Sequence, residues 1–144
     1  MYEQLKLKNQ LCFHLYTASR LVTQSYHPFL APLGLTYPQY LVLLVLWEQN
    51  NLLVSELCRR LMLDTNTLTP LLKRMEKEGL IIRTRGIADG RHTLVSLTKK
   101  GIHLEEDAKN IQACLLEQWQ GKAMDDKQMG DLVTYLDTII DGLK

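Results

Sequence analysis

The run from Leu63 to Ile81, LDTNTLTPLLKRMEKEGLI, limits the possible folds of this chain more than any other stretch. Its apolar residues recur at the i, i+3, i+4, i+7 spacing of one helical face. They are Leu68, Leu71, Leu72 and Met75. The opposite face carries hydroxyls, an amide and cations, which can hydrogen-bond base edges and phosphate oxygens. The run therefore predicts an amphipathic helix whose polar face is suited to DNA.

The ends of this helix are also marked in the sequence. Each residue from Asp64 to Thr67 is a good N-cap, so the helix is expected to begin in that window. Pro70 favours a late start, because a proline in the first turn costs no intrahelical hydrogen bond. Gly79 is a good C-cap.

The flanking segments complete a recognisable unit. A short helical stretch at Val54–Leu61 lies only two residues upstream of the cap window, which predicts a helix-turn-helix. Downstream, Ile81–Arg85 and His92–Leu97 have the composition of strands around a turn that contains Asp89-Gly90. A basic hairpin after a helix-turn-helix indicates a winged helix with its tip near a phosphate backbone. The alternative is a small helical domain whose polar faces are only solvated.

Four further helices are expected outside this unit. The first runs from about Glu3 to Leu30 and is ended by two prolines. Thr36 is expected to cap the second, in which Leu41–Trp47 is apolar on every side and therefore buried. Thr98 is expected to cap a long helix that runs to about Gln120. The last helix, Asp126 to about Leu143, has a continuous apolar stripe.

The terminal helices carry more apolar surface than the winged unit can cover. Packing them against a second copy would bury that surface, and the alternative is a bundle within one chain. The 144 residues suggest one domain, residues 1–144. The predicted fold is mainly α (α+β): a winged helix-turn-helix at residues 33–104, with homodimerisation helices at residues 1–32 and 105–144. A dimer would present two recognition helices to successive half-sites of a pseudo-palindromic operator in double-stranded DNA.

Composition excludes several other classes of protein. No apolar run reaches transmembrane length and the first ten residues do not form a signal peptide, so a cytoplasmic protein with no membrane partner is expected. The net charge of +1 does not by itself indicate nucleic-acid binding, although local clustering of charge matters more than the total. Three cysteines without CxxC spacing and four dispersed histidines predict neither a metal site nor a cofactor.

Cys12 is the candidate for redox chemistry. It precedes Tyr16 by four residues, so both side chains share one helical face. Hydroxyl donors aimed at a sulfur favour the thiolate and can hold an oxidised product. Tyr16, Tyr26 and Tyr37 could serve, and their rings could line a pocket for an apolar oxidant. The alternative is an ordinary core cysteine, which is also the expectation for Cys58 and, from the residues alone, for Cys114.

Four segments together resemble the MarR family of winged-helix regulators, and in particular its OhrR branch, which senses organic hydroperoxides. They are QLCFHLY (Gln10–Tyr16), LGLTYPQYLVLLVLWE (Leu33–Glu48), the run from Leu63 to Ile81, and DGRHTLVSLTKKG (Asp89–Gly101). The resemblance covers nearly the whole chain. It departs from the branch at Thr65-Asn66, where Ser-Gly is usual, at Gly90 in the wing, and at His14.

The resemblance implies a homodimeric repressor that is released from its operator when Cys12 is oxidised by an organic hydroperoxide. It implies hydrogen bonds to Cys12 from Tyr16 and, across the dimer, from Tyr26 and Tyr37. Oxidation gives a sulfenic acid first. The sulfenic acid then pairs with a small thiol or with a cysteine of the partner subunit, for which Cys114 is at the matching position.

The expected DNA contacts divide by chemistry. The polar start of the recognition helix is expected to read the bases with Thr65, Asn66, Thr67 and Thr69, and Pro70 is expected to lie in the same DNA-binding surface. Cations of the helix and the wing are expected to supply phosphate and minor-groove contacts: Lys73, Arg74, Arg83, Arg85 and Arg91.

Three other functions remain open from the sequence. A MarR-type repressor could instead be released by a small phenolic ligand between its winged and dimer regions. A redox-blind activator or structural DNA-binding protein would keep the DNA face without the thiol chemistry. A thiol peroxidase would need a positioned arginine or histidine beside Cys12, which the sequence does not indicate, so no enzyme activity is expected.

Overall fold

The computed structural model describes residues 1–85, 92–119 and 124–144. These residues form two units, Met1–Lys109 and Asn110–Lys144. The expected turn at Asp89-Gly90 and the expected contact residue Arg91 lie outside the described residues.

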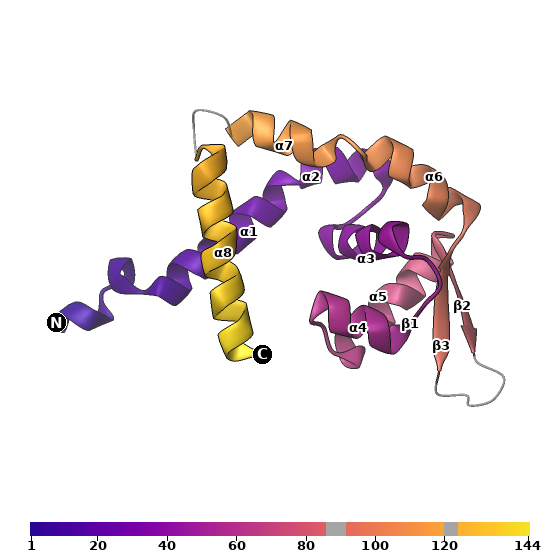
Figure 1. The fold of residues 1–144 in the computed structure, drawn as a ribbon, viewed down its shortest axis with the longest axis horizontal. Coiled ribbons are helices and arrows are strands. Elements are labelled where there is room, and N and C mark those ends of the chain that lie inside the picture. The colour runs from indigo at the N-terminus through magenta and orange to yellow at the C-terminus, as the bar shows by residue number, and fades with distance from the viewer. Residues whose placement is uncertain (86–91, 120–123) are drawn as a thin grey trace. The chain divides into compact units, whose positions relative to one another are not determined.

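The helix-turn-helix has the predicted elements, and its second helix begins within the expected cap window, Asp64 to Thr67. α4 spans Val54–Leu61 and α5 spans Thr65–Lys77 (Figure 1). The expectation of a late start is wrong: the N-cap is Asp64, whose Oδ1 accepts from Thr67 N–H at 2.8 Å. Pro70 consequently lies inside the helix. The helix begins after Asp64 because the Asp64 carboxylate accepts from a first-turn N–H that has no partner within the helix. The helix tolerates Pro70, which lacks the N–H that would donate to the carbonyl four residues earlier.

The end of α5 confirms the role of Gly79 and forms a Schellman motif. Leu80 N–H donates to Met75 O at 2.9 Å and Gly79 N–H donates to Glu76 O at 3.0 Å. Gly79 has φ of 77°, a conformation that suits glycine. Both apolar partners of the motif, Met75 and Leu80, are buried, so the turn into the hairpin is fixed by packing as well as by hydrogen bonds.

The strands of the wing also follow the prediction. β2 (Ile81–Arg85) and β3 (Thr93–Leu97) are antiparallel, with Ile81 opposite Leu97 and Arg85 opposite Thr93. A two-residue strand that the sequence did not indicate, β1 (Leu52–Leu53), pairs with β3, so the sheet order is β1-β3-β2. The short strand joins the entry of α4 to the wing.

α3 (Tyr37–Glu48) forms the centre of the first unit. It packs against α2, α4, α5 and α6, with Val42, Leu43 and Leu46 fully buried. Pro38 lies in its first turn, as expected, and Thr36 is its N-cap, with Thr36 N–H donating to Gln39 Oε1 at 3.1 Å. The helix is not buried on every side, since Leu44 is 40% exposed.

The single N-terminal helix expected from Glu3 to Leu30 is wrong. Two 3-10 turns, Glu3–Leu5 and Leu7–Asn9, precede α1 (Leu11–Ser25), and α2 (His27–Leu30) and a further 3-10 turn, Ala31–Leu33, follow it. At the first break, Asn9 Nδ2 donates to Glu3 O at 2.8 Å and Gln10 Nε2 donates to Gln4 O at 2.6 Å, so side chains replace helical hydrogen bonds. At the second, Pro28 cannot donate to the carbonyl four residues earlier.

The helix expected from Thr98 to Gln120 is also interrupted. Thr98 does cap α6 (Lys99–Ala108), with its Oγ1 accepting from Gly101 N–H at 3.1 Å. The helix ends near Asn110, a poor helix former, and α7 (Ile111–Trp119) begins the second unit.

The last helix, α8 (Asp126–Leu143), confirms the prediction and is capped by Asp125 in a capping box with Gln128. No residue of α8 is buried.

Candidate DNA-binding face and thiol site

The exposed face of α5 carries the residues expected to read bases. Thr65, Asn66, Thr67 and Pro70 are exposed and Thr69 is half-buried, while the four apolar residues of the opposite face are buried. Lys73 and Arg74 continue the exposed face towards the end of the helix. The structure therefore brings these predicted residues together on one exposed surface.

The two basic residues of β2 have different surroundings. Arg85 is exposed at the end of the strand. Arg83 is held by Glu76 of α5: its backbone N–H donates to Glu76 Oε2 at 2.8 Å and its Nη2 lies 3.1 Å from Glu76 Oε1. These bonds from Arg83 lower the pKa of the Glu76 carboxyl, so the pair is ionised at neutral pH. A phosphate at this position would have to share the Arg83 guanidinium with Glu76.

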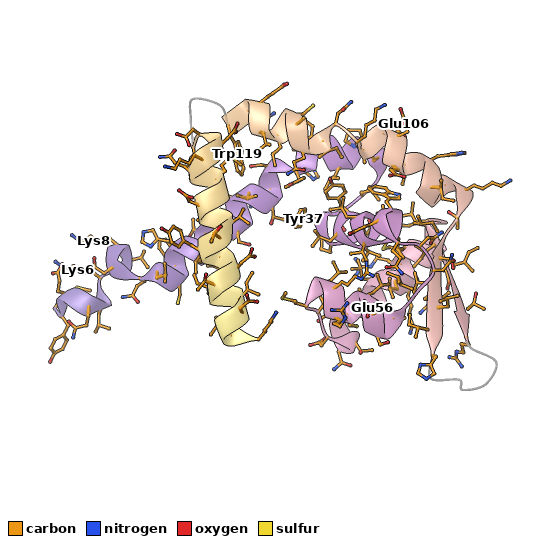
Figure 2. All side chains as sticks on the ribbon, viewed as in Figure 1. Lys6, Lys8, Tyr37, Glu56, Glu106 and Trp119 are labelled. Atoms are coloured by element: carbon orange, nitrogen blue, oxygen red, sulfur yellow. The ribbon has the colours of Figure 1, made fainter. Side chains whose placement is uncertain are left out.

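A second acidic side chain, Glu56, forms ion pairs with two arginines of α4. Glu56, labelled in Figure 2, accepts from Arg59 Nε at 3.0 Å and from Arg60 Nε at 3.0 Å. Hydrogen bonds from Arg59 and then Arg60 lower the pKa of Glu56 to about 2. Arg60 also donates to Gln49 at the end of α3. The Arg60–Gln49 bond thus links α4, the helix that precedes α5, to the end of α3.

Cys12 lies in the first turn of α1 and its side chain is exposed. Tyr16 follows one turn later and is 68% exposed, so the two side chains share an open face of the helix. A rise of 1.5 Å per residue separates Cys12 from the end of α1 at Ser25 by about 20 Å. Tyr26 of the same chain is therefore out of hydrogen-bonding reach of Cys12.

Tyr26 and Tyr37 instead meet each other, with ring centroids 4.9 Å apart. Tyr40 joins them at 5.8 Å from Tyr26 and is buried. Burial raises the pKa of all three phenols, and neighbouring tyrosines add to the effect at Tyr26 and Tyr40. The three hydroxyls consequently keep their protons at neutral pH and are available as donors. Tyr40 was not among the tyrosines expected at the site, although its position three residues after Tyr37 on one helix indicates that the two are neighbours.

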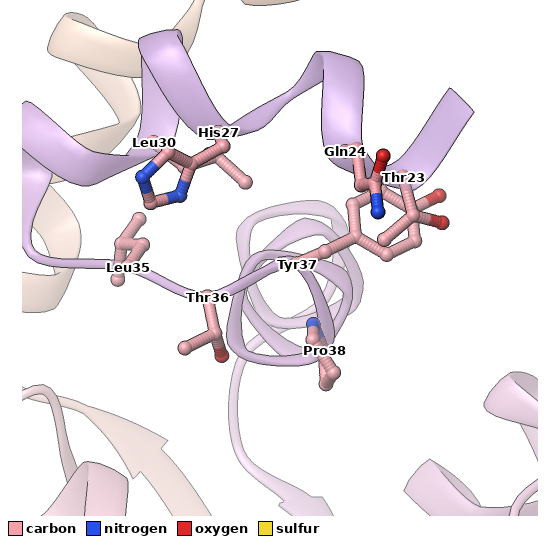
Figure 3. Close-up of a pocket in the computed structure, with 8 residues that line it drawn as sticks. All are labelled: Thr23, Gln24, His27, Leu30, Leu35, Thr36, Tyr37 and Pro38. Atoms are coloured by element: carbon pink, nitrogen blue, oxygen red, sulfur yellow. The ribbon is translucent and has the colours of Figure 1, made fainter. Parts of the chain in front are cut away.

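An open cavity of about 470 Å³ adjoins Tyr37. Figure 3 shows it between the α1–α2 segment and the start of α3. Its lining is mainly apolar, with a few hydroxyl, amide and imidazole groups: Thr23, Gln24, His27, Leu30, Leu35, Thr36, Tyr37 and Pro38. A cavity of this size accommodates a small organic molecule.

The other two cysteines are half-buried. Cys58 Sγ lies 3.9 Å from Thr65 Oγ1, so this thiol packs between the two helices of the helix-turn-helix. Cys114 lies on α7, in the second unit. Within the described residues there is no group of three or more histidine, cysteine or acidic side chains placed to hold a metal ion.

Within the described residues, no single helix has the length and apolar character to cross a membrane. The stretches Leu11–Leu33 and Tyr37–Glu48, bent by 74°, meet those criteria only as a pair.

A helix-turn-helix followed by an antiparallel hairpin, with a polar recognition face, defines the class of winged-helix DNA-binding proteins. Residues 24–108, more than half of the chain, match the family model described as transcriptional regulator SarA/Rot. The chain belongs to this family of MarR-type winged-helix transcriptional regulators.

Individual proteins match nearly the whole chain. The organic hydroperoxide resistance transcriptional regulator of Bacillus subtilis is 47% identical over 139 residues, which are 96% of this chain and 95% of that protein. The structure of reduced AbfR bound to DNA has a TM-score of 0.80 and 36% identity, covering 99% of this chain and 96% of that one. AbfR, from Staphylococcus epidermidis, also has a disulfide-formed structure with a TM-score of 0.67 and 39% identity, covering 96% and 95% of the two chains. The resemblance to the OhrR branch is thereby confirmed.

Proposed function

We propose that this transcriptional regulator is a homodimeric repressor that leaves its operator when an organic hydroperoxide oxidises Cys12. The observation that carries the proposal is the placement of Cys12: an exposed thiol one turn before Tyr16. The Tyr26–Tyr37 pair lies beyond reach along the same chain. A site in which those tyrosines hydrogen-bond the thiol therefore requires a second subunit.

The exposed apolar surface supports the dimer. α1 leaves Leu11, Phe13 and Leu21 exposed, and α8 leaves Leu132, Val133, Ile140 and Leu143 exposed. Covering such surfaces with a second copy removes apolar area from water. We assign dimerisation to residues 1–32 and 105–144 and DNA binding to residues 33–104.

For DNA binding we propose one recognition helix in each of two successive major-groove half-sites of a pseudo-palindromic operator. Thr65, Asn66, Thr67 and Thr69 would contact base edges, and Pro70 would lie against them. Lys73, Arg74, Arg83, Arg85 and Arg91 would contact phosphates or the minor groove.

The proposed oxidation proceeds in two steps. The Cys12 thiolate attacks the terminal oxygen of the hydroperoxide, the O–O bond breaks, and the leaving alkoxide takes a proton from water, so the products are a sulfenic acid and an alcohol. The thiol of Cys114 of the partner subunit then attacks the sulfenic sulfur, so that a disulfide forms and water leaves. A small cellular thiol could take the place of Cys114 in the second step. Each event is stoichiometric, so the protein acts as a switch in the cytoplasm and not as a peroxidase.

The disulfide would displace α1 and, through Tyr37, the start of α3. This displacement would change the spacing of the two recognition helices. Each base-reading contact that is lost costs about 1–3 kcal/mol, and the loss of one or two such contacts is enough for release.

The test is a gel-shift titration on the DNA upstream of the protein's own gene. Reduced protein is expected to bind, cumene hydroperoxide to release it, and dithiothreitol to restore binding. Cys12→Ser is expected to bind DNA and ignore the peroxide, and Cys58→Ser serves as the matched control that retains the response. Peroxide-driven release of Cys12→Ser would exclude the proposed sensing role.

The disulfide partner is tested separately on a non-reducing gel. Oxidised wild-type protein is expected to run as a covalent dimer and Cys114→Ser as a monomer whose Cys12 is still oxidised. A covalent dimer of Cys114→Ser would show that the pairing is wrong.

The cavity beside Tyr37 supports a second candidate, a repressor released by a small phenolic ligand. Its mainly apolar lining with a few polar groups fits such a molecule. This function predicts release of wild-type protein and of Cys12→Ser by the same phenol, with no effect of peroxide on either.

A further inference from the structure

Gln39 is the one buried polar side chain among the described residues, with 2% of its surface exposed. A buried amide is unfavourable unless its hydrogen bonds are made. Gln39 makes one at each end: its Oε1 accepts from Thr36 N–H at 3.1 Å and its Nε2 donates to Glu78 Oε2 at 3.1 Å. Gln39 is not part of the exposed face of α5 that is proposed to bind DNA, and neither of its hydrogen bonds is to a cysteine.

The two partners of Gln39 come from distant parts of the chain. Thr36 immediately precedes Tyr37, whose ring contacts Tyr26 and lines the cavity. Glu78 is the C-cap of the recognition helix and lies 39 residues after Gln39 in the chain. One amide therefore joins the tyrosine-bearing segment to the end of the helix that is expected to read DNA.

The end of the recognition helix is held from the other side as well. Lys100 Nζ donates to Glu78 O at 3.0 Å, and Thr98 Oγ1 donates to Gly79 O at 2.6 Å. These bonds define the position of the end of α5, so Glu78 belongs to an ordered junction between α5 and the start of α6 and not to a loose turn. Close to the same region, the start of α3 and α5 share a small cavity lined by Thr36, Pro38, Thr67, Leu71 and Arg74.

The length of α5 enlarges small motions at this junction. The helix from Thr65 to Glu78 is about 20 Å long, so a rotation of about 10° about its C-terminal end moves Thr65 by about 3 Å. A hydrogen bond to a base edge does not survive a displacement of that size.

We propose that Gln39 is a positioning residue that makes the Tyr37 segment and the recognition helix move together. This inference rests on the proposed function. When oxidation displaces the Tyr37 segment, the Gln39 amide carries the motion to Glu78 and so to the base-reading residues. Without the Gln39 amide, Cys12 is oxidised as before, but the same displacement of the Tyr37 segment moves the recognition helix less.

The experiment measures two quantities for each variant: the fraction of disulfide formed under a fixed dose of cumene hydroperoxide, and the ratio of operator Kd between oxidised and reduced protein. Gln39→Met keeps the volume of the side chain and removes both hydrogen bonds. Glu78→Ala removes the acceptor from an exposed residue, where folding is not at risk. Glu78→Gln keeps an acceptor oxygen, and Lys77→Ala is the matched control on the neighbouring exposed residue.

Disulfide formation is expected to be equal in all variants. The Kd ratio is expected to shrink at least about fivefold in Gln39→Met and in Glu78→Ala, the lower end of typical coupling between sites. The double variant is expected to show no further loss, because both substitutions break the same bond. Glu78→Gln and Lys77→Ala are expected to keep the wild-type ratio.

A wild-type ratio in both Gln39→Met and Glu78→Ala would overturn the assignment of Gln39, and so would an additive loss in the double variant or an equal loss in Lys77→Ala. These outcomes are distinct from failure of the proposed function. In that case wild-type protein itself would show no difference in Kd on oxidation.

Discussion

Replacing Gly101 with alanine tests how closely the wing and α6 approach each other. A Cβ at this position would lie 2.3 Å from the carbonyl oxygen of Leu80 and 3.1 Å from Leu97 Cδ2. The carbonyl cannot rotate away freely, because it accepts from Thr98 N–H at 3.1 Å. Gly101 O in turn accepts from Trp47 Nε1 at 2.9 Å.

The change in the free energy of unfolding caused by Gly101→Ala is the sum of opposing effects. Ordinary contact begins near 3.4 Å, so α6 must shift by about 1 Å to admit the methyl group. Overpacking of this kind costs about 1–3 kcal/mol, and a stretched hydrogen bond at Trp47 or Thr98 costs about 1 kcal/mol more. The better helix propensity of alanine returns about 1 kcal/mol. Gly101→Ala is therefore expected to lower the free energy of unfolding by about 2 kcal/mol.

The assay is urea unfolding followed by circular dichroism at one protein concentration, because association contributes to the apparent stability of a dimer. Gly130→Ala in α8 is the matched control, since nothing lies within 4 Å of its added Cβ. The control is expected to gain about 1 kcal/mol from helix propensity alone. If both variants gain stability to the same extent, the close approach of Gly101 to Leu80 does not hold in solution.

Four further predictions concern single side chains. Met62 ends α4 with φ of 54° and is 59% exposed, so Met62→Gly is expected to raise the free energy of unfolding by about 1 kcal/mol in urea; a loss would contradict the left-handed conformation. Pro70→Ala is expected to restore the helical hydrogen bond to Asn66 O and to raise the urea midpoint by the equivalent of about 2–3 kcal/mol, and an unchanged midpoint would count against a proline inside the helix. Hydrogen bonds from Arg59 and Arg60 lower the pKa of Glu56 from its ordinary value of 4.5 to about 2, so its ion pairs stabilise the fold above pH 4.5 and this contribution is lost as pH falls towards 2. The difference in free energy of unfolding between wild type and Glu56→Gln, followed by urea unfolding, is expected to vanish over that window, and a difference that persists at pH 2 would contradict it. Lys73→Ala is expected to weaken binding to operator and unrelated DNA alike and to reduce the salt slope by about one unit, whereas an unchanged slope would remove Lys73 from the phosphate contacts.

Local patterns in the sequence were sufficient for the DNA-binding unit, apart from the exact start of α5 and the two-residue strand β1. The four apolar positions of α5, the glycine after its end and the alternating strands of the hairpin each define an element without reference to distant residues. Helix caps at Thr36 and Thr98 follow the same logic, because a cap is a bond between residues two or three apart. The family resemblance draws on these same segments.

Local patterns did not predict where the long helices break. Apolar periodicity continues across Gln10, Tyr26 and Asn110, but the helices do not. Side-chain amides at Asn9 and Gln10 take carbonyls that a helix would use, and Pro28 lacks the N–H that would join α1 to α2. Periodicity reports which face is apolar and does not report where the backbone hydrogen bonds break.

The sequence by itself determined the recognition helix, the wing strands and the candidate thiol, because each depends on residue types at fixed short spacings. Only the tertiary structure decided which side chains of separate elements meet. It placed Tyr26 against Tyr37 and Tyr40, held Arg83 against Glu76, paired Leu52–Leu53 with β3, and joined Gln39 to Glu78. These contacts arise when separate elements pack into one core, and no short-range spacing records which surfaces will face each other.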